Sequence, residues 1–480
     1  MRVLVRLSPD ITTKAPRTRA RFVRRLVANL RAALAAEGMP PGIERDHARI
    51  YVDVPGERAL PILRRVFGVH SLSPCLEEPA GPLERIVQRG EELFADAVRG
   101  RRFAVRARVR DRVPWGGQDV NVALGAALAA HGRVDLTNPE ITVSLEVRGG
   151  AVRWYTETVR GEGGLPLGVQ GRAVVLLSGG FDSAVAAWLA MRRGVEVDLV
   201  FCRLGGEAHE RAVFPIADLL ALDWAAGSSP RLFVVPFEET AARLAAGVVE
   251  PLRQLVLKRL MYRTAAAVAR LVRAEAVITG EALGQVSSQT LRNLRALGDA
   301  DGLPVLRPLL AWSKEEIIAL ARRIGTHDLS AGVPEYCALV PRKPATGARA
   351  AAVRREEENV PFDPFAAVRA GRRVDLPAGP AGEDALAVDT IPGGAVVLDL
   401  REEEESRRLP LPGAVRIDPL ALDRLDPASF AGKTVVVACR RGLRSGWVAF
   451  ELRRRGIEAV HLAGGVAAWM RRRKGPGPGA

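Results

Sequence analysis

The chain has 480 residues, too many for one ordinary domain, and carries 70 lysines and arginines against 55 acidic residues. Its net charge of +15 and sequence pI near 10.6 favour a polyanionic partner such as nucleic acid, although a GC-rich genome would also enrich arginine. Four cysteines exclude a disulfide framework, and no apolar run approaches the roughly 20 residues that span a bilayer, so we expect a cytoplasmic protein with no membrane partner.

The N-terminal region predicts a small α+β unit, which we place at 1–75. Residues 1–7 alternate as a strand does, 18–38 have helical periodicity, and a strand and a helix follow at 48–55 and 58–69. Five arginines gather at the start of the first helix, namely Arg17, Arg19, Arg21, Arg24 and Arg25. They would form a basic surface able to meet phosphates, although a solvated helix face would have the same composition.

A second unit is expected at 76–165. Its pattern is a helix at 83–98, a strand at 101–110, a helix at 119–132, and then two strands joined by a Gly-Gly turn within 135–159. The Gly-rich stretch that follows reads as a linker.

From 172 to 340, apolar strands alternate with helices, which predicts a doubly wound domain with a parallel sheet covered on both faces. Residues 341–385 are weakly patterned and rich in Ala, Arg, Pro and Glu, and we expect a linker there. A smaller α/β unit is placed at 386–472, followed by a disordered tail at 473–480. The fold class is therefore multidomain, with α+β units first and α/β units after them.

Residues 177–185 read LSGGFDSAV, between an apolar strand and a helix. Gly179 and Gly180 would let backbone N–H groups approach an anion, and the helix N-terminus adds partial positive charge, so this is a predicted phosphate site. No lysine follows the glycines, as it does in the usual nucleotide loop. Asp182 beside phosphates instead implies Mg²⁺ between them. An ordinary Gly-rich turn is the competing interpretation.

A second motif, VVVACRRGLRSGW, places Cys439 at the end of a buried strand and before a helix. Backbone N–H groups of the loop, together with Arg440, Arg441 and Arg444, would stabilise a thiolate, which is the form able to carry a persulfide. An isolated cysteine after a strand would more often be a core residue.

The motifs resemble known families. SGG-x-DS is the signature of PP-loop ATP pyrophosphatases, in which ATP is cut between its α- and β-phosphates and the loop holds pyrophosphate. The cysteine loop resembles a single rhodanese domain, together with Asp399 and Arg401, LPGAVRI, and HLAGGVAAW with Trp469.

Nearly the whole chain resembles the tRNA 4-thiouridine synthetase (tRNA sulfurtransferase) family. That family has a ferredoxin-like unit, a THUMP RNA-binding domain, a PP-loop domain and a rhodanese domain. LGGEAHE, VLKRLMYR, TGEALGQVSSQTL and PEYCALV are its further markers here. The resemblance implies ATP and Mg²⁺ as cofactors and tRNA as a partner.

By position, the resemblance implies a nucleotide-binding set of Leu176, Leu177, Ser178, Gly179, Gly180, Asp182, Ser183, Lys258, Gly280 and Gln289. By residue type alone, Lys258 would be a surface helix lysine and Gln289 a surface amide. Asp182 is expected to support adenylation through metal, and Lys314 is a further candidate at the activated site. No protein metal-ligand set is expected.

For sulfur transfer, the resemblance implies that a cysteine desulfurase loads Cys439. The persulfide then converts the uridine at the eighth position of tRNA, adenylated at its C4 oxygen, to 4-thiouridine. Cys337 would form a redox-active disulfide with Cys439, which a reductant reopens. Cys75 and Cys202 have no expected role.

Two other activities stay open. One is sulfur transfer to a small carrier protein for thiamine thiazole synthesis. The other is a PP-loop ligase or amidating enzyme acting on a small metabolite, against which the two cysteines argue.

Overall fold

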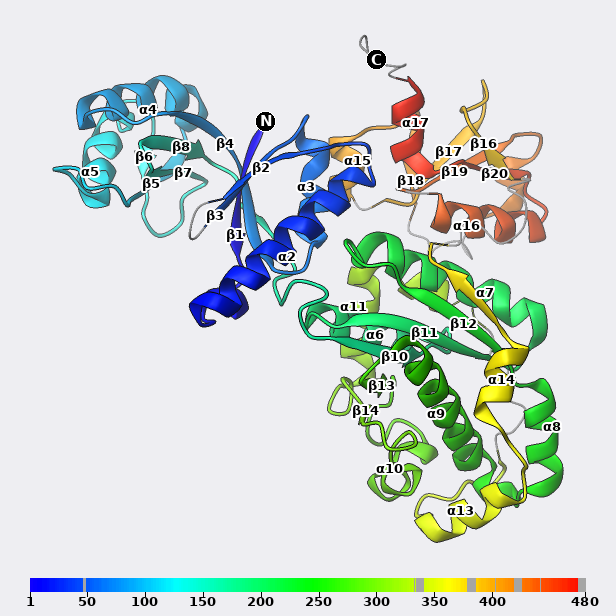
Figure 1. The fold of residues 1–480 in the computed structure, drawn as a ribbon. Coiled ribbons are helices and arrows are strands. Elements are labelled where there is room, and N and C mark those ends of the chain that lie inside the picture. Colours follow the sequence, from blue (N-terminus) through cyan, green and yellow to red (C-terminus); the bar gives the residue numbers. More distant parts are fainter. Residues whose placement is uncertain are drawn as a thin grey trace. The chain divides into compact units, whose positions relative to one another are not determined.

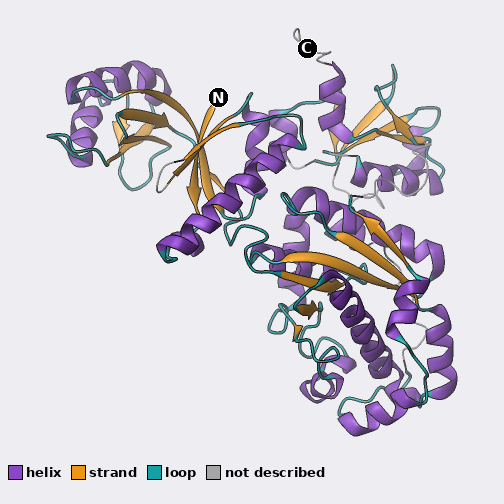
Figure 2. Ribbon diagram, viewed as in Figure 1, coloured by secondary structure: helices purple, strands orange, loops and turns teal. Residues whose placement is uncertain are grey.

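The computed structural model describes residues 1–45, 49–331, 333, 341–377, 386–401, 403–417, 425–440 and 442–473. The chain divides into two compact units, Met1–Gly164 and Leu165–Ala480, shown as a ribbon in Figure 1. We call them the N-terminal and C-terminal units. Helices accompany the strands of every sheet, as Figure 2 shows, and the expected mixture of α+β and α/β domains is confirmed.

The N-terminal unit is built on one nine-stranded sheet. Its path is β2 (Gly42–Arg45), β3 (Arg49–Asp53), β1 (Arg2–Leu7), β4 (Val69–Pro79), β8 (Ala151–Tyr155), β7 (Ile141–Arg148), β5 (Arg102–Val109) and β6 (Arg133–Val134), with β9 (Val159–Arg160) also on β4. Strand β4 pairs with β1 along its first part and with β8 along its last part. The two expected α+β halves therefore share one continuous strand.

Five helices complete this unit: α1 (Pro9–Thr12), α2 (Pro16–Ala35), α3 (Leu60–Arg65), α4 (Leu83–Val98) and α5 (Gly117–Leu128). Helix α2 forms because its apolar residues recur on one face, where Phe22, Leu26 and Leu30 are at most 2% exposed. Of the five arginines noted above, Arg17, Arg21 and Arg24 are exposed and the other two are half-buried. The basic side of α2 therefore faces solvent.

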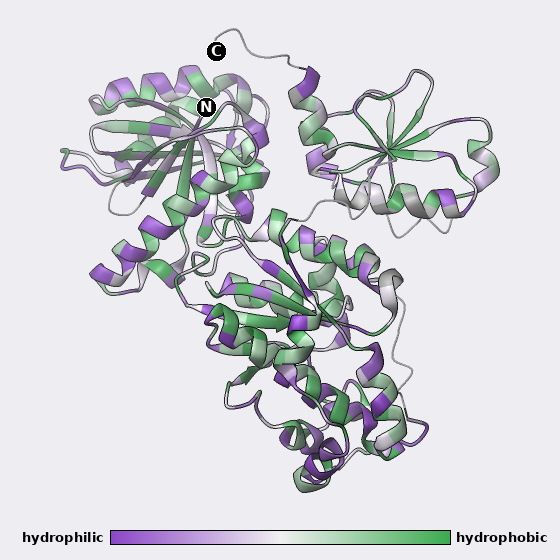
Figure 3. Ribbon diagram, turned by 45° about the vertical axis from the view of Figure 1, so that its right-hand side comes forward, coloured by the Kyte–Doolittle hydropathy of each residue, from purple (hydrophilic) through white to green (hydrophobic). Residues whose placement is uncertain are grey.

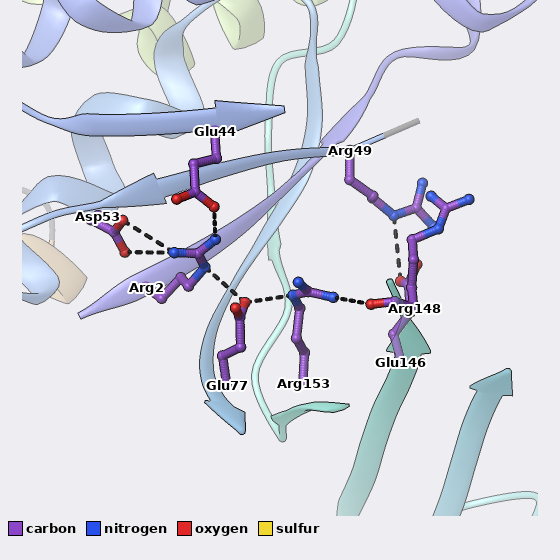
Figure 4. A network of polar contacts seen from close by, with 8 residues as sticks. All are labelled: Arg2, Glu44, Arg49, Asp53, Glu77, Glu146, Arg148 and Arg153. Atoms are coloured by element: carbon purple, nitrogen blue, oxygen red, sulfur yellow. Dashed lines mark hydrogen bonds and ion pairs between the residues drawn. The ribbon is translucent and has the colours of Figure 1, made fainter. Parts of the chain in front are cut away.

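A network of charged side chains lies where the two halves of the sheet join (Figure 4). Glu77 at the end of β4 bonds to Arg2 of β1 at 2.8 Å and to Arg153 of β8 at 2.7 Å. The Arg153 guanidinium lies 4.1 Å from the centre of the Tyr51 ring on β3. Arg2 also pairs with Glu44 and Asp53, and Arg49 pairs with Glu146. These contacts tie strands of the first half to strands of the second.

The first part of the C-terminal unit has a six-stranded sheet. Its order is β14 (Val305–Leu306), β13 (Ala276–Ile278), β10 (Arg172–Leu176), β11 (Glu196–Arg203), β12 (Arg231–Pro236) and β15 (Arg372–Asp375). The first five strands are parallel, and β15 is antiparallel to β12. The chain starts in the middle at β10, proceeds to β12, and returns on the other side of β10 with β13. In such sheets ligands bind at the carboxyl ends of the strands where the order reverses.

Between β10 and residue 331 the α-helices are α6 (Phe181–Arg192), α7 (Gly206–Leu219), α8 (Glu238–Gly247), α9 (Arg253–Val272), α10 (Leu291–Leu297), α11 (Lys314–Ile324) and α12 (His327–Ala331). Both α6 and α9 pack against β10. The strands and α9 share a buried core, which agrees with the hydrophobic strands visible in Figure 3.

The expected linker over 341–385 differs from the structure. Residues 350–375 form α13 (Ala350–Glu358), α14 (Pro364–Ala370) and strand β15, and they pack on the preceding domain. Val353 and Val360, which are 0% and 3% exposed, belong to the same core as α9. The pattern is weak because half of the apolar residues are alanines, and the larger ones are separated by charged runs such as RREEE at 354–358. Residues 378–385, and the expected tail from 474 onward, lie outside the described residues.

The last part of the chain has a five-stranded parallel sheet. Its order is β16 (Ala387–Val388), β20 (Ala459–Leu462), β19 (Val435–Ala438), β17 (Val396–Asp399) and β18 (Ala414–Arg416). Helices α15 (Glu403–Arg408), α16 (Leu443–Arg454) and α17 (Gly465–Arg473) accompany it. Successive residues of β19 enter two different cores, with Val435 and Val437 in one and Val436 and Ala438 in the other. Because both faces are covered, this strand is a continuous apolar run.

No helix within the described residues is long and apolar enough to cross a membrane.

Glu77→Gln tests the junction between the two halves of the N-terminal sheet. It removes the charge shared by Arg2 and Arg153, and Arg153 is only 7% exposed. We expect the local free energy of unfolding to fall by roughly 1–3 kcal/mol, because the buried Arg153 guanidinium loses its charged partner. Amide hydrogen exchange in β1, β4 and β8 should accelerate accordingly. The control Glu44→Gln removes the charge of a side chain that is 67% exposed, and its effect should stay within about 0.5 kcal/mol. Equal effects of the two changes would contradict the assigned importance of Glu77.

Candidate functional site

The predicted phosphate loop lies between β10 and α6, at the carboxyl end of the sheet where the strand order reverses. Leu176 ends β10, Leu177 is 2% exposed, and Gly180 is the N-cap of α6. The Ser183 hydroxyl accepts a hydrogen bond from the Ser178 backbone N–H and donates one to the Gly180 carbonyl, both at 3.1 Å. The loop is thereby closed by its own serine, and the first N–H groups of α6 face the turn.

Two glycines give the loop its shape. Gly179 has a φ of +85°, in the left-handed region that favours glycine. Gly280 follows β13, and a Cβ placed on it would lie 2.6 Å from both the carbonyl carbon of Asp182 and the amide nitrogen of Ser183. The backbone after β13 therefore lies directly against the start of α6, and only glycine permits this approach.

Asp182 lies in a polar cluster at this edge. The Lys314 ammonium, on α11, is 2.9 and 3.0 Å from the two carboxylate oxygens of Asp182. Gln285 donates an amide hydrogen bond to Asp182 at 3.0 Å, and the Lys314 ammonium also lies 5.4 Å from the centre of the Phe181 ring. Lys314, the further candidate from sequence, is thus brought to the loop. Gln285 was missed, although it belongs to the TGEALGQVSSQTL motif.

Lys258 and Gln289 reach the same edge from other elements. Lys258 on α9 donates to Glu281 at 3.0 Å, and Glu281 directly follows Gly280. Gln289 ends a short turn, Ser287–Gln289, and is only 8% exposed, so it is not a surface amide. Among the described residues no hydrogen-bond partner meets its buried Oε1.

These groups fit a nucleoside triphosphate. Unpaired N–H groups at a helix start and the nearby lysines suit phosphates, while the orphaned acceptor of Gln289 suits an amino or hydroxyl hydrogen of the nucleoside. Among the described residues, no group of three or more His, Cys, Asp and Glu side chains is arranged to hold a metal ion. Asp182 is the carboxylate of the loop itself.

The second candidate site is centred on Cys439, which follows β19 and is 3% exposed. Its Sγ accepts hydrogen bonds from the backbone N–H groups of Gly442 at 3.1 Å and Ser445 at 3.4 Å, and it lies 3.3 Å from the Ser445 hydroxyl. Gly442, the N-cap of α16, has a φ of +90°. This cradle of N–H groups at a helix N-terminus stabilises a thiolate.

Of the three arginines expected around this thiol, only the side chain of Arg440 is described, and it lies 3.8 Å from a carboxylate oxygen of Glu405. Behind the loop, Arg401 binds both carboxylate oxygens of Asp399, and these residues are 2% and 0% exposed. Burial raises the pKa of Asp399, but Arg401 and Ser406 outweigh it and hold the pKa below its usual range. This buried ion pair therefore fixes the end of β17, the strand that pairs with β19 just before Cys439.

Cys337 lies outside the described residues, as does its expected disulfide with Cys439. The nearest described residues are Val333 before it and Pro341 after it. A Cβ on Gly179 would meet the Val333 side chain at 3.0 Å, and the Arg342 N–H donates to Glu250 at 2.7 Å. Both flanks thus attach to the nucleotide-loop domain.

The other two cysteines are poor nucleophiles. Burial, with a smaller contribution from Glu77, raises the pKa of Cys75 to about 11. Burial also raises the pKa of Cys202. Both thiols stay protonated near neutral pH, in keeping with the absence of an expected role.

The chain matches known families along its whole length. Residues 2–73 match the ThiI ferredoxin-like domain, 83–155 the THUMP domain, 168–362 the family described as thiamine biosynthesis protein (ThiI), and 386–472 the rhodanese-like domain.

Curated relatives cover the same span. The tRNA sulfurtransferase of Pyrobaculum aerophilum is 38% identical over 476 residues, covering 96% of each chain. That of Citrobacter koseri is 33% identical, covering 96% of this chain and 99% of its own. A solved structure described as a 4-thiouridine synthetase–RNA complex with bound ATP has a TM-score of 0.67 and 28% identity, covering 78% of this chain and 99% of its own.

Gly280→Ala tests the close approach of β13 to α6. The added methyl must displace the Asp182–Ser183 peptide, at a cost of roughly 1–3 kcal/mol. We expect Mg-ATP binding, measured by titration calorimetry, to weaken roughly tenfold or more. Gly247→Ala is the control, because its Cβ would meet nothing closer than 3.4 Å. Unchanged affinity in the Gly280 variant would show that the loop does not bind the nucleotide.

Proposed function

The chain belongs to the ThiI family of tRNA sulfurtransferases, and we propose that it adenylates the uridine at the eighth position of tRNA and replaces its C4 oxygen with sulfur from Cys439. One observation carries the proposal. The same C-terminal unit holds a phosphate-type loop, with Asp182 and Lys314 beside it, and a thiol cradled by backbone N–H groups.

In the proposed adenylation half, ATP supplies an AMP group that makes the uridine's C4 oxygen a leaving group. The backbone of Ser178–Ser183 receives the departing pyrophosphate, as the N-terminus of α6 favours. Lys258 and Gln289 hold the nucleotide, with Gly280 allowing the close approach. Asp182 would hold Mg²⁺, whose positive charge would compensate for a carboxylate beside the phosphates.

Lys314 has a separate part in this proposal. Its bidentate contact with Asp182 keeps an ammonium at the mouth of the loop, on the N-terminus of α11. There it neutralises the negative charge that develops as the α–β phosphate bond breaks. Gln285, in the loop after β13, also holds the Asp182 carboxylate through its hydrogen bond.

In the proposed sulfur half, a cysteine desulfurase passes sulfur to Cys439 as a persulfide. The terminal sulfur bonds to C4 of the adenylated uridine, and AMP leaves with the former C4 oxygen. The Cys337 thiolate then attacks Sγ of Cys439, which breaks the bond to the transferred sulfur and forms the Cys337–Cys439 disulfide. A dithiol reductant restores both thiols.

The position of Cys337 in the sequence supports its proposed role in the disulfide step. The nearest described residue before it in the sequence is Val333, whose side chain lies against Gly179 of the nucleotide loop.

For tRNA we propose the N-terminal unit as the binding platform. It contains the THUMP match, and the exposed arginines of α2 offer phosphate contacts that weaken with salt. Sulfur transfer to a carrier protein for thiazole synthesis is a second candidate function, favoured by the thiamine biosynthesis description of the central match. The relatives and their names give no support to the amidating alternative.

The direct test is conversion of unmodified tRNA with Mg-ATP, a cysteine desulfurase, cysteine and reductant, followed by nucleoside mass spectrometry. We expect 4-thiouridine from the wild type and none above background from Cys439→Ala or Asp182→Ala. Cys75→Ser is the control, because its protonated thiol has no part in the route. Failure of the intact enzyme to make 4-thiouridine, despite persulfide on Cys439, would refute the proposed reaction.

Cys337→Ser separates loading of sulfur from its release. Cys439 should still acquire a persulfide, detectable by intact-protein mass spectrometry, because that step does not use Cys337. Product should stop at no more than about one 4-thiouridine per enzyme, since nothing resolves the sulfur bond on Cys439. Multiple turnovers at the wild-type rate would exclude the disulfide step.

A further inference from the structure

The Glu281 carboxylate accepts hydrogen bonds from four side chains although the residue is only 5% exposed. Its Oε1 accepts from Lys258 Nζ at 3.0 Å, and its Oε2 accepts from the Tyr262 hydroxyl at 2.5 Å, the Thr279 hydroxyl at 3.1 Å and Arg307 Nε at 2.8 Å. Four donors, two of them charged, therefore hold the carboxylate in a single orientation.

Two cations meet this one anion, and they differ in how they are held. Arg307 is fixed on three sides, since it also donates to the Tyr262 hydroxyl at 3.2 Å and to the Val305 carbonyl at 3.3 Å. Lys258 uses one of its three N–H donors on Glu281, and among the described residues no second acceptor meets it. The cluster therefore has one net positive charge and an ammonium with two donors to spare.

The protonation states agree with this geometry. Burial raises the pKa of Glu281, but Lys258, Tyr262 and Arg307 outweigh it, so the pKa lies below its usual range. Burial raises the pKa of Tyr262, and the Glu281 charge raises it further. The carboxylate is thus ionised and the phenol a donor near neutral pH.

The cluster lies beside the nucleotide loop. Thr279, Gly280 and Glu281 follow one another at the carboxyl end of β13, and Gly280 lies against the start of α6. Strand β13 pairs with β10, whose end begins the loop. The Lys258 side chain is 23% exposed, whereas that of Glu281 is 7% exposed. Lys258 is therefore the more accessible partner of the pair.

We propose that Glu281 is a positioning residue that aims the Lys258 ammonium at the phosphates of the bound nucleotide. The inference rests on the proposed nucleotide role of Lys258. Glu281 need not touch the nucleotide: it fixes one N–H of the ammonium, so that the other two point outward in a defined direction. Arg307 and Tyr262 hold the carboxylate in place while Lys258 is engaged.

The alternative is a purely structural cluster that joins β13, α9 and β14. A structural cluster would contribute to stability whether or not Lys258 is present, whereas a positioning residue acts only through Lys258. A double-mutant cycle distinguishes these, because two residues that act as one unit have non-additive effects.

The test measures Mg-ATP dissociation constants of the full chain by titration calorimetry for Glu281→Gln, Lys258→Ala and the double variant. We expect each single change to weaken binding about tenfold. The double variant should bind no more than about twofold more weakly than Lys258→Ala alone. Glu281→Asp, which keeps the charge on a shorter side chain, should recover part of the affinity, and it also serves if the Gln variant fails to fold.

Glu357→Gln is the matched control. Glu357 pairs with Arg259 and Arg263 of the same helix α9, and its side chain is 11% exposed, but it does not contact Lys258. Its replacement should leave ATP affinity unchanged in both backgrounds.

Two outcomes would overturn the inference. In the first, the loss of ATP affinity in the double variant equals the product of the losses in Glu281→Gln and Lys258→Ala. In the second, Lys258→Ala loses affinity and the Glu281 variants do not. Wild-type affinity in Lys258→Ala would instead refute the proposed role of the lysine itself, and with it the premise.

Discussion

Both candidate sites are built on the backbone N–H groups that a helix leaves unpaired at its N-terminus. At α6 these groups follow the SGGFDS turn, and at α16 they surround the sulfur of Cys439. In each case a buried parallel strand ends immediately before the turn, and a glycine with positive φ, Gly179 or Gly442, lets the backbone reverse. The same interaction thus suits a phosphate in one place and a thiolate in the other.

Two lysines add positive charge near the N-terminus of α6, and each is paired with a carboxylate. The Lys314 ammonium is held by Asp182 and that of Lys258 by Glu281, so each lysine at the nucleotide edge has a carboxylate behind it. Such pairing keeps the ammonium groups ordered before any ligand arrives, which lowers the entropic cost of binding. The two pairs differ in burial, since Glu281 is almost enclosed and Asp182 is half-buried.

Much of this was predictable from sequence. The parallel sheets, the loop after β10 and the cysteine after β19 follow from apolar runs and glycine spacing, and the fold classes and family are confirmed. The packing of 350–375 was not predictable, because the two core residues Val353 and Val360 are separated by a run of charged residues. Gln285 and Glu281 were missed because their partners, Asp182 and Lys258, come from distant segments that only the folded sheet brings together.

The continuous strand β4 limits how the N-terminal unit can vary among relatives. Its 11 residues pair with β1 on one stretch and β8 on the next, without a turn between them. Inserting or deleting one residue in the middle would exchange the two faces of every side chain beyond that point. Cys75 and Glu77 would then point to the face now occupied by Leu76. Unless a β-bulge compensates, the number of residues between the two halves can therefore change only in steps of two, so the length of β4 is far more constrained than its sequence.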